Sequence, residues 1–201
     1  MKRQNDCLAL LASDRIDTTQ VAKLFDEASP DERVEMTEAI DGRAQARLWL
    51  ASEGHGVTIG QMVPSTRAPL DPVIFHGKNS LAAFSRFQKR FCRPTNDADE
   101  LWGYNHQPTR WLAPLTGPGY FVAYDSQESF GGVAVDYRRI PTARPDDWPE
   151  IHDNTWRLSR FIYNGMVDYL RRVSEHLLIG RATRDGRELP NYFLLCRKDD
   201  S

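Results

Sequence analysis

The arrangement of apolar and polar positions in the first forty residues predicts helices. Ser29 and Pro30 precede the segment DERVEMTEAI, so a capping residue and a first-turn proline are followed by acidic residues at a helix start. Asp41 and Gly42 are residue types that mark the end of a helix. We therefore expect residues 1–42 to form a helical N-terminal segment.

After residue 42 the pattern changes to short apolar runs, in several of which polar positions alternate. Gly, Pro, Asn or Asp residues stand at most boundaries, and Asp185 followed by Gly186 predicts a hairpin turn between the last two runs. The runs are ARLWLA, GVTIGQMV, PVIF, GYFVAYD, GGVAVDY, SRFIY, EHLLIGRAT and NYFLLC. Because helices do not alternate with these runs, the pattern disfavours a Rossmann-type fold.

These elements predict a single domain over residues 1–201 that is mainly β (α+β). Residues 43–201 are expected to form a lipocalin-like antiparallel β-barrel, or a strongly curved sheet, beside the helical N-terminal segment. A barrel of about eight strands encloses a space that side chains fill or that holds one small ligand.

Three segments carry other patterns. Residues 81–91 (LAAFSRFQKRF) space their apolar positions at intervals of three and four, which predicts a helix. Residues 166–173 (MVDYLRRV) predict a second short helix, on which Asp168 and Arg171 would face each other. Residues 138–156 are rich in Pro and Asp and predict a long loop that acts as a lid or flap over the sheet.

Composition and charge limit the kinds of partner and cofactor that the protein is expected to have. A chain of 201 residues with a net charge of −2 lacks the large basic field of many nucleic-acid binders. The apolar run CLALLA is too short for a membrane span or a signal peptide, which favours a cytoplasmic protein.

Cys7, Cys92 and Cys196 lack the spacing of metal ligands and are expected to be buried free thiols. No phosphate loop, nucleophile elbow or zinc motif is present, so no cofactor or metal is expected.

Two stretches could line a ligand cavity. His76 and Lys78 directly follow an apolar strand, where Lys78 could meet an anionic head group or simply be solvated in a turn. Trp102, Tyr104 and His106 alternate and would share one side of a strand. They would form an aromatic wall for an apolar ligand, or the face of an edge strand covered by the N-terminal helices.

Acidic residues and histidines supply candidates for proton transfer. If Asp136 points inward it needs a cationic partner, which Arg138 or Arg160 could provide. His176 begins the strand after the second short helix. The candidate catalytic residues are Asp136, Asp168 and His176, and the candidate ligand-binding residues are His76, Lys78, Trp102, Tyr104, His106, Tyr124, Arg138, Tyr163 and Arg171.

The C-terminal half resembles the small bacterial and fungal GXWXG-type proteins with their C-terminal domain of unknown function. The resemblance implies a small lipocalin-like barrel with a helical N-terminal segment and brings no established reaction. The G-x-W-x-G sequence itself is absent, because GRAQARLWLASEG stands in its place. The matching residues are Gly77 and Lys78 for the GK pair, Asp168, Leu170, Arg171 and Val173 for D-x-F-R-x-V, Ile179 and Gly180 for the hydrophobic-Gly step, and residues 192–195 for the closing strand.

Three functions follow from this reading. The first is a binding protein for a small lipophilic molecule held in the barrel. The second is a cofactor-independent isomerase, dehydratase or cyclase that uses acid-base residues of the same pocket. The third is an interaction protein without a cavity, in which Phe84, Phe87 and Phe91 dock on a partner. The sequence does not decide the oligomeric state, and a homodimer is compatible with it.

Overall fold

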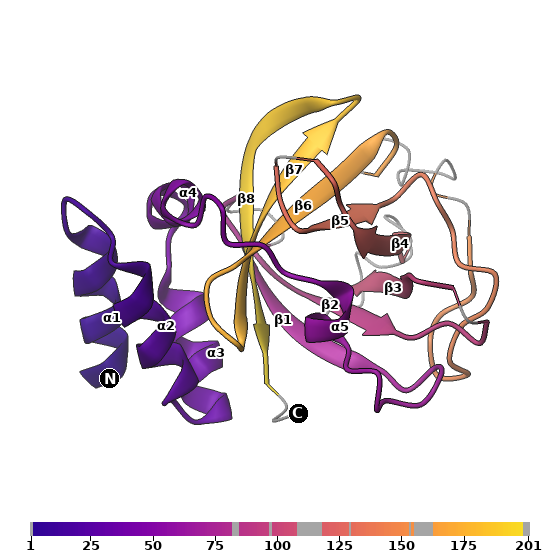
Figure 1. The fold of residues 1–201 in the computed structure, drawn as a ribbon, viewed down its shortest axis with the longest axis horizontal. Coiled ribbons are helices and arrows are strands. Elements are labelled where there is room, and N and C mark those ends of the chain that lie inside the picture. Colours follow the sequence, from indigo (N-terminus) through magenta and orange to yellow (C-terminus); the bar gives the residue numbers. More distant parts are fainter. Residues whose placement is uncertain are drawn as a thin grey trace.

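The fold comes from a computed structural model, which describes residues 2–81, 85–96, 98–107, 118–128, 130–152, 154 and 163–198. Four helices come first, a one-turn helix follows, and the strands complete the chain (Figure 1). In order these are α1 (Lys2–Ala12), α2 (Thr18–Asp26), α3 (Pro30–Ala39), α4 (Gly42–Ala51), α5 (Ile59–Met62), β1 (Val73–Asn79), β2 (Arg86–Cys92), β3 (Leu101–His106), β4 (Tyr120–Asp125), β5 (Val133–Asp136), β6 (Met166–Arg172), β7 (Leu177–Arg184) and β8 (Arg187–Arg197).

Within the described residues, eight antiparallel strands pair with their sequence neighbours and close into one barrel. Closure is made by β8, which pairs with β1 in a register that sets Phe75 opposite Arg197. This confirms the expected fold class, a mainly β barrel with a helical N-terminal segment. Aromatic and aliphatic side chains fill much of the interior, among them Phe75, Phe91, Phe121, Leu170 and Leu195.

Helices α1 to α4 form a layer outside the barrel, beside β7, β8 and β1 (Figure 1). The cap of α3 is a capping box between Ser29 and Glu32, and Asp41 caps α4 by accepting a hydrogen bond from Ala44 N at 2.8 Å. The apolar faces of the helices pack on the outward side chains of β7 and β8 in a second core. The side chains on the outer face of this part of the barrel are therefore buried, as those in its interior are.

One end of the barrel is closed by the segment that contains α5. Val57, Ile59, Met62 and Val63 are buried with the barrel core. The start of α5 is held by Asp125 of β4, whose Oδ1 accepts a hydrogen bond from Ile59 N at 2.7 Å. Among the described residues, this segment covers one end of the barrel and leaves the strand ends on the opposite side as the place where a ligand could enter.

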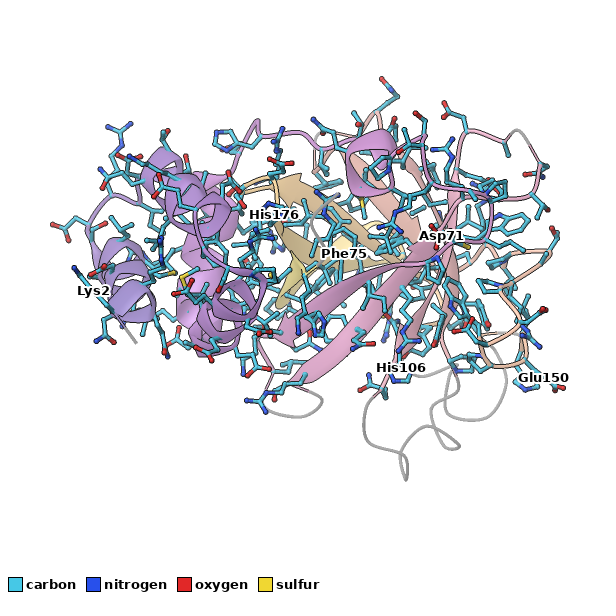
Figure 2. All side chains as sticks on the ribbon, turned by 90° about the horizontal axis from the view of Figure 1, so that it is seen from below. Lys2, Asp71, Phe75, His106, Glu150 and His176 are labelled. Carbon is cyan, nitrogen blue, oxygen red and sulfur yellow. The ribbon has the colours of Figure 1, made fainter. Side chains whose placement is uncertain are left out.

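The Pro- and Asp-rich segment after β5 lies on the outside of β3 and β4. Trp148 packs on Tyr104 with ring centroids 4.7 Å apart, and the Tyr120 hydroxyl donates to Pro149 O. The helical layer and this segment lie on opposite sides of the barrel, so the molecule is elongated. Lys2 of the helical layer and Glu150 of this segment lie at opposite ends of its long axis (Figure 2). Among the described residues, no helix is long and apolar enough to cross a membrane.

Four local expectations were wrong. ARLWLA belongs to α4 and TIGQM to the region of α5, where both were expected to be strands. Residues 86–92 and 166–172 are strands β2 and β6, where helices were expected. In residues 86–92 and 166–172, pairing with neighbouring strands outweighs the helix-like spacing of the apolar positions. Most of the expected strand SRFIY, including Arg160, lies outside the described residues, as does Phe84.

Candidate functional site

The end of the barrel away from α5 contains a cavity of about 490 Å³. The strand ends that surround it are those farthest from α5, so the cavity and the α5 segment lie at opposite ends. Its wall is aromatic and aliphatic, with a few polar groups. The lining residues are Asn79, Leu81, Phe87, Lys89, Asn105, Gln107, Tyr137, Tyr163, Met166, Asp168, Ala182, Arg184, Leu189, Asn191 and Phe193.

Lys89 is the innermost residue that β2 contributes to the cavity. It shares the inward face of β2 with Phe87 nearer the mouth and Phe91 deeper in the core. Its side chain is only 2% exposed. Its Nζ lies 3.0 Å from Asp168 Oδ2 and 3.0 Å from Asn105 Oδ1, and it also contacts the Tyr137 hydroxyl. A charge at this depth is tolerated because it has a counter-charge and hydrogen-bond partners.

The polar groups around Lys89 also form hydrogen bonds with one another. The Tyr137 hydroxyl accepts a hydrogen bond from Asn105 Nδ2 at 2.9 Å and donates to Asp168 Oδ2 at 3.2 Å. With three partners, an ammonium group at Lys89 uses all of its donors. Asp168 Oδ1 is the exception, since this buried oxygen has no hydrogen-bond partner among the described residues. This oxygen can therefore accept a hydrogen bond from a ligand.

Aromatic rings surround the Lys89 nitrogen. Nζ lies 4.9 Å from the ring centroid of Tyr137, 5.1 Å from that of Phe121, 5.1 Å from that of Phe193 and 5.8 Å from that of Phe87. Ring faces attract a cation and exclude water at the same time. The nitrogen is therefore buried in a site that accepts a positive charge.

Burial changes the acid-base properties of this cluster. Desolvation lowers the pKa of Lys89, and the Asp168 carboxylate opposes this change in part. Burial, with the Asp168 charge as a smaller cause, raises the pKa of Tyr137 well above its ordinary value. Burial also raises the pKa of Tyr163, which stacks on Tyr137, to about 12. Both tyrosines are neutral hydrogen-bonding groups at physiological pH.

Two of the twelve predicted site residues lie in this cavity, Asp168 and Tyr163. The expected Asp168–Arg171 pair was wrong, because residues three apart on strand β6 point to opposite faces. Arg171 points outward, donates to Trp49 O and Phe130 O, both at 2.8 Å, and lies over the Trp49 ring. Its contacts join α4 to the barrel.

The two stretches that were expected to line a ligand cavity lie on the outer surface of the barrel. His76 and Lys78 alternate with inward positions of β1, and His76 faces α3. Trp102, Tyr104 and His106 share one face as predicted, but it is the outer face, covered by the segment around Trp148 rather than by the N-terminal helices.

The remaining candidates also lie outside the cavity. Tyr124 alternates with an inward alanine and lies under the Arg139 guanidinium. Asp136 forms an ion pair with Arg138 at 2.8 Å on the outer face of the sheet, which identifies the partner left open by the sequence. His176 is buried between the helical layer and the barrel, where burial lowers its pKa (Figure 2).

Three residues of the cluster were missed from the sequence: Lys89, Asn105 and Tyr137. The signal for Lys89 was present in RFQKRF, where period-two spacing sets it between two phenylalanines on one face. Those phenylalanines, Phe87 and Phe91, point into the barrel and are not available to dock on a partner. The three cysteines are buried and free, as expected.

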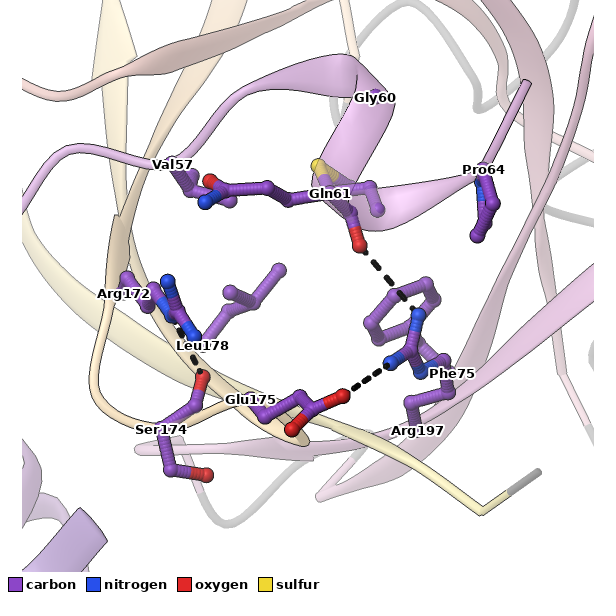
Figure 3. Close-up of a pocket in the computed structure, with 11 residues that line it drawn as sticks. Val57, Gly60, Gln61, Pro64, Phe75, Arg172, Ser174, Glu175, Leu178 and Arg197 are labelled. Atoms are coloured by element: carbon purple, nitrogen blue, oxygen red, sulfur yellow. Dashed lines mark hydrogen bonds and ion pairs between the residues drawn. The ribbon is translucent and has the colours of Figure 1, made fainter. Parts of the chain in front are cut away.

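A second cavity of about 380 Å³ lies beside α5 at the closed end (Figure 3). Arg197 of β8 reaches across it to Gln61 O, with Nη1 at 3.3 Å, and to the Glu175 carboxylate at 4.0 Å. Arg172 Nε donates to Ser174 O at 3.4 Å. The Arg197 contact ties α5 to β8, whereas the Arg172 contact stays within the turn between β6 and β7. Across the described part of the chain, no group of three or more His, Cys, Asp or Glu residues is placed to hold a metal ion.

Comparison of the sequence with protein-family models finds no match, and neither does comparison of the chain with curated proteins or with solved structures.

Proposed function

We propose that the protein binds a small, largely apolar molecule in the barrel cavity, with a polar group of that molecule directed towards Lys89 and Asp168. The observation that supports this most strongly is a buried Lys–Asp pair at the inner end of a cavity of about 490 Å³ with mostly apolar walls. Ligand pockets typically measure roughly 300–1,000 Å³ and combine apolar walls with a few placed polar groups.

The fold alone gives little reason for this pair. Removing two charges from water costs several kcal/mol per ion, and apolar residues of similar volume are often as stabilising or more so. Other interior positions of the barrel are apolar, as Phe91, Phe121 and Leu170 show. A buried charged pair that lines a cavity is better explained by a ligand than by packing.

Titration with the neutral fluorescent probe N-phenyl-1-naphthylamine tests the cavity. We expect saturable binding with one site per chain. Leu189→Trp places an indole at the cavity mouth and should weaken binding by about tenfold or more, equivalent to at least about 1.4 kcal/mol. The control Leu50→Trp makes the same change at a position 68% exposed on α4 and should bind the probe as the wild-type protein does. A folded wild-type protein without saturable binding would contradict the proposal.

A cofactor-independent isomerase, dehydratase or cyclase is the second candidate. It is favoured by the mutual hydrogen bonds of Lys89, Tyr137 and Asp168, which supply groups able to give and take protons in one cavity. Native mass spectrometry of protein purified from its own host would identify a co-purifying molecule. An enzyme should convert that molecule on incubation, and Asp168→Asn should stop conversion while the molecule still binds. Unchanged ligand with the wild-type protein would favour the binding function.

A further inference from the structure

Lys89 differs from the other four lysines of the chain in its surroundings. Lys2 is exposed, Lys23 has a side chain that is 73% exposed, Lys198 is 45% exposed, and Lys78 is half-buried on the outside of β1. Lys89 alone among the five lines the barrel cavity. Exposed lysines are ammonium ions at neutral pH and are poor nucleophiles, because their ordinary pKa is about 10.4.

The groups that contact Lys89 can remove and return its proton. Asp168 Oδ2 lies 3.0 Å from Nζ, and the other carboxylate oxygen has no partner among the described residues. Both side chains are buried, so transfer of one proton would convert the ion pair into a neutral amine and a neutral carboxylic acid and would remove both desolvation penalties. The Tyr137 hydroxyl contacts both partners and can relay a proton between them.

We propose that Lys89 forms a reversible imine with an aldehyde or ketone group of an apolar molecule in the barrel cavity. The inference rests on the proposed function, since the carbonyl compound must first enter that cavity. Nucleophilic lysines in other proteins are activated by desolvation in the same way. The lowered pKa of Lys89 agrees with this role, and the charged or titratable groups that line the cavity with it are Asp168, Tyr137, Tyr163 and Arg184.

The step balances without any further reactant. The ammonium proton moves to Asp168, and the freed lone pair of Nζ attacks the carbonyl carbon to form a C–N bond. The carbonyl oxygen takes one proton from the attacking nitrogen through the Tyr137 hydroxyl and a second from Asp168. It leaves as water while the nitrogen lone pair forms the C=N bond. The products are a protonated imine, a restored Asp168 carboxylate and water.

The site suits the product as well as the reactant. The N–H of the protonated imine can donate to Asp168 Oδ2, so the ion pair of the free protein is replaced by a second ion pair at the same place. The rings of Phe87, Phe121 and Phe193 stabilise a cation there and limit the access of water that would hydrolyse the imine. The apolar remainder of the ligand would occupy the cavity towards Leu189.

Reductive trapping tests the inference directly. The wild-type protein is incubated at pH 7 with decanal and sodium cyanoborohydride, and the products are analysed by intact mass spectrometry and peptide mapping. We expect one adduct per chain on Lys89, with an added mass equal to that of decanal less one oxygen atom. Lys89→Arg should lose the adduct. The control Lys23→Arg, a change of the same kind on the exposed face of α2, should retain it.

Displacement of N-phenyl-1-naphthylamine by decanal and by 1-decanol separates the two proposals. Both compounds should displace the probe, and only decanal should form an adduct. Displacement by decanal with Lys89 unmodified, or with adducts only on the exposed lysines, would overturn imine formation and leave the binding function standing. A wild-type protein that binds neither probe nor decanal would overturn both. Peptide mapping of the wild-type protein decides the question even if Lys89→Arg does not fold.

Discussion

Replacing Lys89 alone should destabilise the protein much more than replacing Lys89 and Asp168 together. Lys89→Met leaves the Asp168 carboxylate in the barrel without its cation, and Asp168→Val leaves the ammonium group without its anion. The double variant Lys89→Met/Asp168→Val removes both charges. Asn105 and Tyr137 would keep their mutual hydrogen bond of 2.9 Å in all three variants.

The magnitude follows from the separation of the charges. At 3.0 Å and an effective dielectric constant of about 20, the attraction between Nζ and Oδ2 is about 5.5 kcal/mol. Desolvation of the two groups opposes it by several kcal/mol for each ion. We therefore expect each single substitution to lower the free energy of unfolding by about 3–5 kcal/mol, and the double variant to lie near the wild-type value or up to about 4 kcal/mol above it.

The assay is urea-induced unfolding followed by circular dichroism and by the fluorescence of the five tryptophans. A loss of about 3–5 kcal/mol is a large part of the roughly 5–15 kcal/mol that stabilises a typical domain, so the midpoints should shift clearly. The four proteins form a double-mutant cycle. If the double variant loses the sum of the two single losses, Lys89 and Asp168 act independently and the description of the cavity as a charge-paired site is refuted.

Three further substitutions test the framework around the cavity, each measured by thermal or urea unfolding. Arg171→Met removes the hydrogen bonds and ring contact that join α4 to the barrel and should cost roughly 2–4 kcal/mol, with little effect on probe binding. Asp41→Ala removes the cap of α4 and should cost about 1 kcal/mol; no measurable loss would show that this cap is dispensable. In Gly132→Ala the new Cβ would lie 2.3 Å from the backbone of Val57 and should cost about 1–3 kcal/mol, whereas Gly56→Ala meets nothing within 4 Å and serves as its control.

Much of the architecture could be predicted from the chain because its signals are local. The cap at Ser29 and the turn at Asp185 and Gly186 depend on neighbouring residues only, and both occur where they were expected. The short apolar runs bounded by turn residues are local signals as well, and they indicated an antiparallel barrel. The errors fall on β2 and β6, where a few residues fit either period and pairing with adjacent strands decides between them.

In β3 the sequence by itself determined which residues share a face, and only the tertiary structure decided which face points into the barrel. Trp102, Tyr104 and His106 do lie on one side, but that side is covered from outside by the segment around Trp148. The barrel strands bury apolar side chains on both faces, inward in the barrel core and outward under the helices or this segment. Hydrophobicity therefore cannot tell inside from outside here. Closure of the sheet, which brings β2 and β6 across the interior from each other, is what joins Lys89 to Asp168.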